Sequence, residues 1–167
     1  AENVLTKPQI TAWRTGRVKA VGSKTAPELY AAHLSQREAA QILSNFFYDV
    51  RLKSRIELRV ADSMPPRYIA AYAQLVKSVF GSPAALQNVL RHYAGITTLD
   101  ITTAKLAVCK DGFNALAYGK PISSELTWLL MQARSRTPSQ EERALLDPFM
   151  ALVMKRKTIR ETENYNE

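Results

Sequence analysis

The side chains best suited to chemistry in this sequence are the cations of residues 50–60. Apolar residues alternate there with charged ones, and the charged positions are Arg51, Lys53, Arg55, Glu57 and Arg59. On a β-strand, alternate side chains project from one face about 6.6–6.8 Å apart. Phosphates along a nucleic-acid strand have a similar spacing, and cations that neutralise them gain affinity by releasing counterions. The pattern predicts a half-buried strand whose outer face contacts phosphates.

A second group of cations lies in the N-terminal section, residues 1–34, which carries five Lys and Arg against two acidic residues. Residues 17–21 alternate in polarity and predict a short strand that pairs beside residues 50–60. That pairing would add Arg14, Arg17 and Lys19 to the basic surface.

Trp13 and Tyr48 would then be available to stack on bases. The alternative is a solvated strand face whose cations protect an edge strand from aggregation. Both interpretations stay open, as does whether the basic residues form one patch.

Residues that mark an enzyme or a metal centre are sparse. One cysteine, Cys109, and two histidines, His33 and His92, cannot supply the usual structural zinc site. The chain has no phosphate-binding glycine loop, nucleophile elbow or metalloprotease motif. We therefore expect a protein that is not an enzyme and needs no metal or cofactor.

The remaining reactive side chains each have a structural explanation. Glu141 and Glu142 suit the first turn of a helix, where negative charge complements the helix dipole. Asp100 and Asp111 suit turns. His92 follows Arg91 and is expected on a solvated helix face, and Cys109 has apolar neighbours that predict a buried, inert thiol.

Length and composition predict one globular domain. The chain has 167 residues, of which 46% are hydrophobic and 23% charged. Residues 1–8 and 160–167 are expected to be frayed ends. The net charge of +8 favours an acidic partner, although soluble proteins often carry such a charge.

Membrane insertion is not expected, because no apolar run approaches the roughly 20 residues of a spanning helix. Cytoplasm is the default location, and the Ala-Glu start leaves the periplasm as a lesser alternative.

The predicted fold is α+β and predominantly helical, with about five to seven helices and a small two- or three-stranded sheet built around residues 50–60. A capping box at Ser35–Glu38 opens one helix. Pro66 and Pro83 each stand in the first turn of a further helix, and Gly81 separates the two. Later helices are expected from Ser123 or Ser124 and from Thr137–Ser139, the last with a kink or break at Pro148.

Two segments are harder to assign. Residues 96–102 are a second candidate partner for the strand at 50–60. Residues 103–118 suit a helix capped by Thr102 and ended by Gly119, but Asp111-Gly112 is also a hairpin signal. The alanine content favours the helix.

Apolar spacing predicts which faces of the helices are buried. For the helix after Pro66, the residues at helical spacing are Ile69, Tyr72, Ala73, Val76, Val79 and Phe80.

The function expected from these features is non-enzymatic nucleic-acid binding, in a regulatory or accessory protein with weak sequence preference; DNA and RNA stay equally open. A helix-turn-helix is disfavoured, because neither candidate, 5–14 or 34–43, has a second helix beside it.

The alternative is a protein-interaction module, an adaptor, chaperone or accessory subunit. Its sign would be an exposed apolar patch around Trp128, Leu129 and Met131 or around Phe149, Met150 and Met154. The spacing of these residues favours the core instead.

Overall fold

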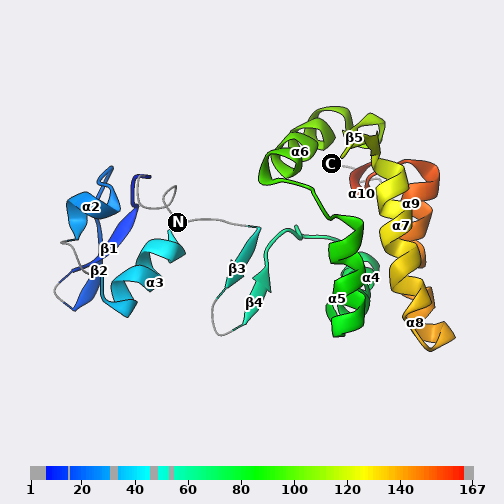
Figure 1. Cartoon of the computed structure of the whole chain (residues 1–167), viewed down its shortest axis with the longest axis horizontal. Coiled ribbons are helices and arrows are strands. Elements are labelled where there is room, and N and C mark those ends of the chain that lie inside the picture. Colours follow the sequence, from blue (N-terminus) through cyan, green and yellow to red (C-terminus); the bar gives the residue numbers. More distant parts are fainter. Residues whose placement is uncertain (1–6, 15, 31–33, 46–48, 53–54, 164–167) are drawn as a thin grey trace. The chain divides into compact units, whose positions relative to one another are not determined.

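The computed structural model describes residues 7–14, 16–30, 34–45, 49–52 and 55–163 (Figure 1). The chain groups into two compact units, residues 1–62 and residues 63–167. Each unit has its own cluster of buried apolar side chains. The fold is α+β and predominantly helical, as the sequence predicts, while the assignment of the whole chain to one domain stays a prediction.

The first unit contains a β-hairpin. Strands β1 (Thr11–Arg14) and β2 (Arg17–Ala20) pair antiparallel, with Thr11 opposite Ala20 and Arg14 opposite Arg17. Gly16 in the connection has a φ of 78°, which favours glycine. The predicted pairing of residues 17–21 with residues 50–60 is wrong, because β2 takes the neighbouring segment as its partner.

Two helices cover this hairpin unit. Thr25 begins α2 (Ala26–Leu29) and Ser35 begins α3 (Gln36–Ser44), and each helix has a capping box. The box at Ser35 confirms the predicted helix start, and the helix ends at Ser44 with Asn45 as its C-cap. The helices contribute to a small core made of Ala12, Ala26, Leu29, Tyr30 and Ile42.

The side-chain amide of Asn45 joins the end of α3 to β1. Its Oδ1 accepts from the backbone N–H of Thr11 at 3.1 Å, and its Nδ2 donates to the Thr11 carbonyl at 2.7 Å. The Asn45 amide also donates to Gln9, whose side chain is fully buried. Asn45 therefore satisfies both backbone groups of Thr11, as a neighbouring strand would.

Residues 50–60 form a hairpin and not the predicted continuous strand. Strands β3 (Val50–Leu52) and β4 (Ile56–Leu58) pair antiparallel, with Arg51 opposite Glu57. The polarity alternation is the same on both arms, and Ser54, the one position where it fails, falls between them. Lys53 and Ser54 lie outside the described residues.

The second unit is built around three helices that pack on one another: α4 (Pro66–Phe80), α7 (Ile122–Ser135) and α9 (Asp147–Lys155). Helix α5 (Pro83–His92) packs on α4. The predicted starts of α4 and α5 at their prolines are confirmed, whereas α7 begins at Ile122 and not at either serine. The core of this unit is Val79, Leu130, Ala133 and Leu146.

The predicted buried face of α4 is correct at Val79 but is otherwise displaced by about one residue. Ile69 and Phe80 are more than half exposed, and the buried side chains are Tyr68, Ala71, Gln74, Ser78 and Val79. The face that packs inward carries two polar residues, so apolar spacing alone selects the neighbouring face.

Helix α6 (Thr98–Asp111) replaces the expected strand at 96–102. Thr97 and Asp100 form its capping box, so Thr102 is not the cap. The helix ends before Gly112, and a short 3-10 turn, η1 (Gly112–Asn114), leads to strands β5 (Leu116–Ala117) and β6 (Lys120–Pro121). The favoured helix is thus confirmed as far as Asp111, although it does not continue to Gly119, and the alternative hairpin at Asp111-Gly112 is wrong. The hairpin that the structure does contain is formed by residues 116–121.

The C-terminal helices break at Pro148 as predicted. Helix α8 (Gln140–Ala144) starts after Ser139, and α9 begins at Asp147 with Pro148 in its first turn. Between them, Leu146 is fully buried. A short helix, α10 (Ile159–Thr162), follows Thr158. Among the described residues, the strands form three separate two-stranded sheets.

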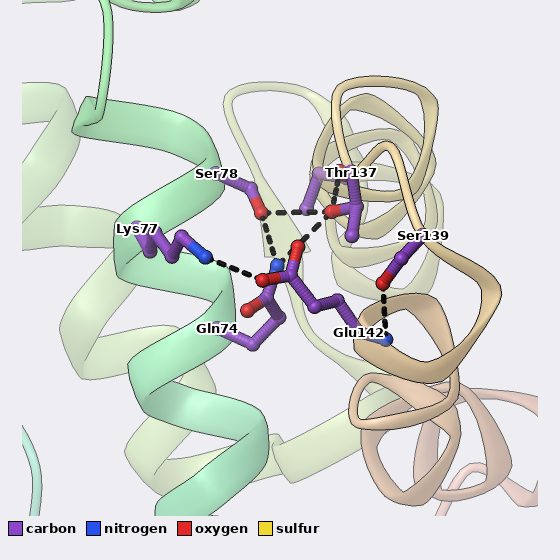
Figure 2. A network of polar contacts seen from close by, with 7 residues as sticks. Gln74, Lys77, Ser78, Thr137, Ser139 and Glu142 are labelled. Carbon is purple, nitrogen blue, oxygen red and sulfur yellow. Dashed lines mark hydrogen bonds and ion pairs between the residues drawn. The ribbon is translucent and has the colours of Figure 1, made fainter.

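A buried polar cluster fixes α4 against the turn between α7 and α8 (Figure 2). The Nε2 of Gln74 donates to Ser78 and to Thr137, each at 3.1 Å. The hydroxyl of Thr137 donates its one proton to the carbonyl of Ala133 at 2.8 Å. Ser78 must therefore be the donor in its 3.0 Å contact with Thr137. All three side chains are buried.

Replacing Thr137 with Val should lower the free energy of unfolding by about 1–3 kcal/mol, because Gln74 and Ser78 lose a buried acceptor. Chemical denaturation of wild type and variant measures this difference. Thr127→Val is a matched control, since Thr127 also donates to the carbonyl four residues earlier but is exposed. Equal losses for the two variants would contradict the role assigned to the buried cluster.

Candidate functional site

The β3–β4 hairpin brings its cations to one carboxylate. The Nε of Arg51 donates to Oε2 of Glu57 at 2.9 Å, and its Nη2 donates to Oε1 at 3.1 Å. Arg59 approaches the same carboxylate, with its Nε 3.7 Å from Oε1. The three side chains share one face of the hairpin, because Arg51 and Glu57 are cross-strand partners.

This arrangement differs from the ladder predicted along a single strand. Two of the four predicted cations, Arg51 and Arg59, form ion pairs with Glu57. This carboxylate lowers the positive charge that they present to a ligand. Arg55 is exposed just before β4, and Lys53 lies outside the described residues. The hairpin is therefore a compact group of charges and not an extended row at phosphate spacing.

The β1–β2 hairpin carries the other predicted cations. Arg17 and Lys19 are exposed at alternate positions of β2, and Arg14 stands opposite Arg17 in the register. The side chains of Arg14 and Trp13, and the whole of Tyr48, lie outside what the structure describes. Since β2 does not pair with β3 or β4, the strand pairing that would have joined the two basic groups is absent.

A second candidate site, missed by sequence reasoning, surrounds Glu125 on α7. Its side chain is 7% exposed, and its Oε2 lies 3.0 Å from Nε2 of His92. Its Oε1 lies 3.4 Å from the ammonium of Lys120 on β6. Because an ionised carboxylate only accepts, the Nε2 of His92 is the donor.

A cluster of aromatic rings begins at His92, beside this carboxylate. The imidazole of His92 stacks on Trp128 with ring centroids 3.5 Å apart, and Tyr93 meets Trp128 edge-on at 5.7 Å. Tyr118 meets Tyr93 edge-on at 5.6 Å. The rings come from α5, the β5–β6 turn and α7, so the cluster ties three elements together.

The environment shifts the ionisation of two groups in this cluster. Burial by itself would raise the pKa of Glu125, but hydrogen bonds from His92 and Lys120 outweigh burial and lower that pKa. Burial raises the pKa of Tyr93, and the neighbouring Glu125 carboxylate raises it further. Glu125 is thus held as an anion and Tyr93 as a neutral phenol.

Two expectations about reactive residues are corrected here. His92 is not a solvated helix residue, since its side chain is 19% exposed and both stacked and hydrogen-bonded. Cys109 is exposed and not buried, since apolar neighbours on α6 such as Leu106 are themselves exposed and do not cover it. The one feature of the sequence that could have indicated this site is Glu125, a charged residue that lies among the apolar residues of α7.

Within the described part of the chain, no three His, Cys, Asp or Glu side chains come together as a possible metal site. None of the helices there has the length and apolar character to cross a bilayer. In comparisons with known proteins, no family model matches this sequence and no curated protein is significantly similar to it. The site must therefore be interpreted from its own geometry.

Replacing Glu125 with Gln should lower the free energy of unfolding at pH 7 by about 1.5–3 kcal/mol, the contribution of hydrogen bonds to a charged group. The pKa of Glu125 lies below its ordinary value of 4.5 in the folded state, so its stabilisation is present above pH 4.5 and is lost as the pH falls below it. The difference in unfolding free energy between wild type and variant should therefore become smaller in that acidic range.

Urea unfolding between pH 3 and pH 7 measures both effects. The exposed capping acids Glu28, Asp100 and Glu161 also have lowered pKa values, but they are common to both proteins and cancel in the difference. Glu141→Gln, an exposed acid on α8, is the control and should change stability little at any pH. A difference in unfolding free energy that is constant between pH 3 and pH 7 would show that Glu125 does not titrate as described.

Proposed function

We propose that this chain is a non-enzymatic nucleic-acid-binding accessory protein, cytoplasmic, which contacts phosphates through cations of residues 1–62. The observation that supports this most is the exposed β2 strand, on which Arg17 and Lys19 stand at alternate positions. Such residues share a strand face about 6.6–6.8 Å apart, near the spacing of phosphates along one strand. A two-stranded β-ribbon also fits the major groove of duplex DNA.

The charge balance of this unit supports the same proposal. Residues 1–62 carry ten Lys and Arg and six Asp and Glu. Of the acids, Glu28 and Glu38 accept from backbone and hydroxyl groups at the starts of α2 and α3. Glu57 is held by Arg51. These three acids are thus engaged in local structure, while Arg17 and Lys19 face solvent.

The proposed contact carries little sequence information. Lysine and arginine contacts to phosphate fix position and give affinity, whereas base edges give specificity. We expect binding that falls steeply with salt and depends weakly on sequence.

The experiment is fluorescence anisotropy with labelled single-stranded and duplex oligonucleotides at about 50 and 200 mM salt. The double variant Arg17→Ser, Lys19→Ser should weaken binding at low salt. Its slope of log affinity against log salt should fall by about 1.4 for single strands or about 1.8 for duplex, if both contacts are to phosphate. The single-strand to duplex ratio selects the substrate class.

The matched control is the double variant Arg91→Ser, Lys110→Ser, which removes two exposed cations from helices of residues 63–167. It should leave the salt slope unchanged. If both double variants weaken binding equally, the effect is one of net charge and the assignment to β2 fails. If the wild type binds no probe at low salt, the proposed function fails.

The β3–β4 hairpin makes a separate prediction of increased affinity. Glu57→Gln removes the carboxylate that holds Arg51 and Arg59, and should strengthen nucleic-acid binding at low salt by about two- to fivefold, the strength of a surface ion pair. The same anisotropy titration measures it, with Glu141→Gln as the charge-matched control. Weaker binding by Glu57→Gln would show that the ion pair helps to present the hairpin to the ligand.

One observation favours a protein-interaction module as the second candidate function. Trp128, Met150, Val153 and Met154 line an open groove of about 590 Å³ between α7 and α9, and Met154 is 80% exposed. Methionine-rich surfaces adapt to varied apolar partners. Leu129 and Phe149 pack against the core, as their spacing predicts, and Met150 and Val153 of the groove pack against the same core. Light scattering over a range of concentrations distinguishes the two, since a stable oligomer favours the module.

A further inference from the structure

A cavity of about 330 Å³ opens between α6 and α7 in the second unit. One side is formed by Ala104, Lys105, Val108 and Cys109 of α6. The opposite side is formed by residues of α7, and Tyr93, Ala117 and Tyr118 complete the lining. Its volume falls in the range of small-molecule sites, which are concave, mostly apolar and hold few polar groups.

The cavity has two charged lining residues, Glu125 and Lys105. Glu125 is its one acidic lining residue, and that carboxylate is held by His92 and Lys120. Most other lining side chains are apolar or aromatic. A ligand there would meet aliphatic carbon and two phenol rings, with a neutralised carboxylate behind them.

The backbone at Tyr118 gives independent support. Tyr118 has a φ of 55° and Gly119 a φ of 77°, so both central residues of the β5–β6 turn are left-handed. Such turns favour Asn-Gly, and a tyrosine in this conformation is strained. Residues held in strained backbone conformations cluster at ligand sites. Here the strained position places an aromatic ring at the cavity and edge-on to Tyr93.

We propose that this cavity binds a small, neutral aromatic molecule, packed against the rings of Tyr93 and Tyr118. An anionic ligand would lose its hydration against walls that are mostly apolar, where Lys105 is the one basic lining residue. A cationic ligand would compete with Lys120 and His92 for a carboxylate whose contacts they already fill. A nucleobase would bring several hydrogen-bonding groups to walls that offer them few partners.

This inference is independent of the proposed nucleic-acid contacts, because every residue of the cavity belongs to residues 63–167. The anisotropy measurement and the ligand measurement can therefore fail separately.

Cys109 provides a direct readout of occupancy. It is the single cysteine of the chain, it is exposed, and it lines the cavity. The probe is N-phenyl-1-naphthylamine, a neutral aromatic compound whose fluorescence rises in apolar surroundings. At ten times its dissociation constant, it should slow the reaction of the Cys109 thiol with Ellman's reagent by about tenfold, since only the empty fraction reacts.

Two variants on one helix test the location. Val108→Trp places a large ring in the cavity and should weaken probe binding at least about tenfold. Leu106→Trp makes a similar change at a position of α6 that is 67% exposed and does not line the cavity, and it should bind as the wild type does. The wild-type thiol protection stands by itself if Val108→Trp fails to fold.

Tyr118→Asn separates binding from folding. Asparagine suits the left-handed turn, which offsets the lost edge-on contact with Tyr93, so thermal stability should change little. Loss of the ring should weaken probe binding at least about fivefold. The sulfonated analogue anilinonaphthalenesulfonate should bind more weakly than the neutral probe.

Saturable probe binding that leaves the Cys109 reaction rate unchanged would overturn the proposal. So would equal binding by Val108→Trp and Leu106→Trp, the absence of any saturable fluorescence change, or tighter binding of the sulfonate.

Discussion

The buried hydroxyl of Thr137 sets the geometry of the second unit. It accepts from Gln74 and Ser78 on α4 and donates to the last turns of α7, so it fixes how these two helices face each other. The backbone carbonyl of the same residue accepts from Nε of Arg143 at 2.6 Å, which holds α8 against the turn. Lys77 and Glu142 join α4 and α8 at the surface beside this cluster (Figure 2).

The path of the chain beyond α8 follows from that arrangement. With α8 fixed by Arg143, the break before Pro148 places Leu146 in the core next to Leu130 and Ala133. Helix α9 then returns along α7 and α4. A polar contact therefore directs the packing of an apolar core, because hydrogen-bonded side chains tolerate few alternative geometries whereas apolar contacts tolerate many.

The sequence predicts those parts of the fold that depend on local chemistry. Capping residues and prolines act within one turn, so the starts of α3, α4 and α5 and the break at Pro148 could be predicted. The buried face of α4 could not, because Gln74 and Ser78 are buried by a partner that lies 59 to 63 residues away in sequence. The polarity of the partner, and not that of the helix, determines which face turns inward.

The same distinction applies to the sites. Alternating polarity over residues 50–60 correctly indicates extended backbone, but one strand and a hairpin give the same alternation when the turn occupies an odd number of positions, here residues 53–55. The pairing of Arg51 with Glu57 is visible only once the hairpin is known. Likewise, His92 and Glu125 are 33 residues apart, and no pattern within either helix indicates that they meet.

The Asn45 amide has a consequence for the solubility of this protein. A two-stranded hairpin has two outer edges, and each unpaired backbone group there can recruit a strand from another molecule. Asn45 occupies both backbone groups of Thr11 on the outer edge of β1. The side chain of Asn45 thereby blocks the addition of a strand from another molecule at this position. Such strand addition, repeated in register, is how a fibril forms.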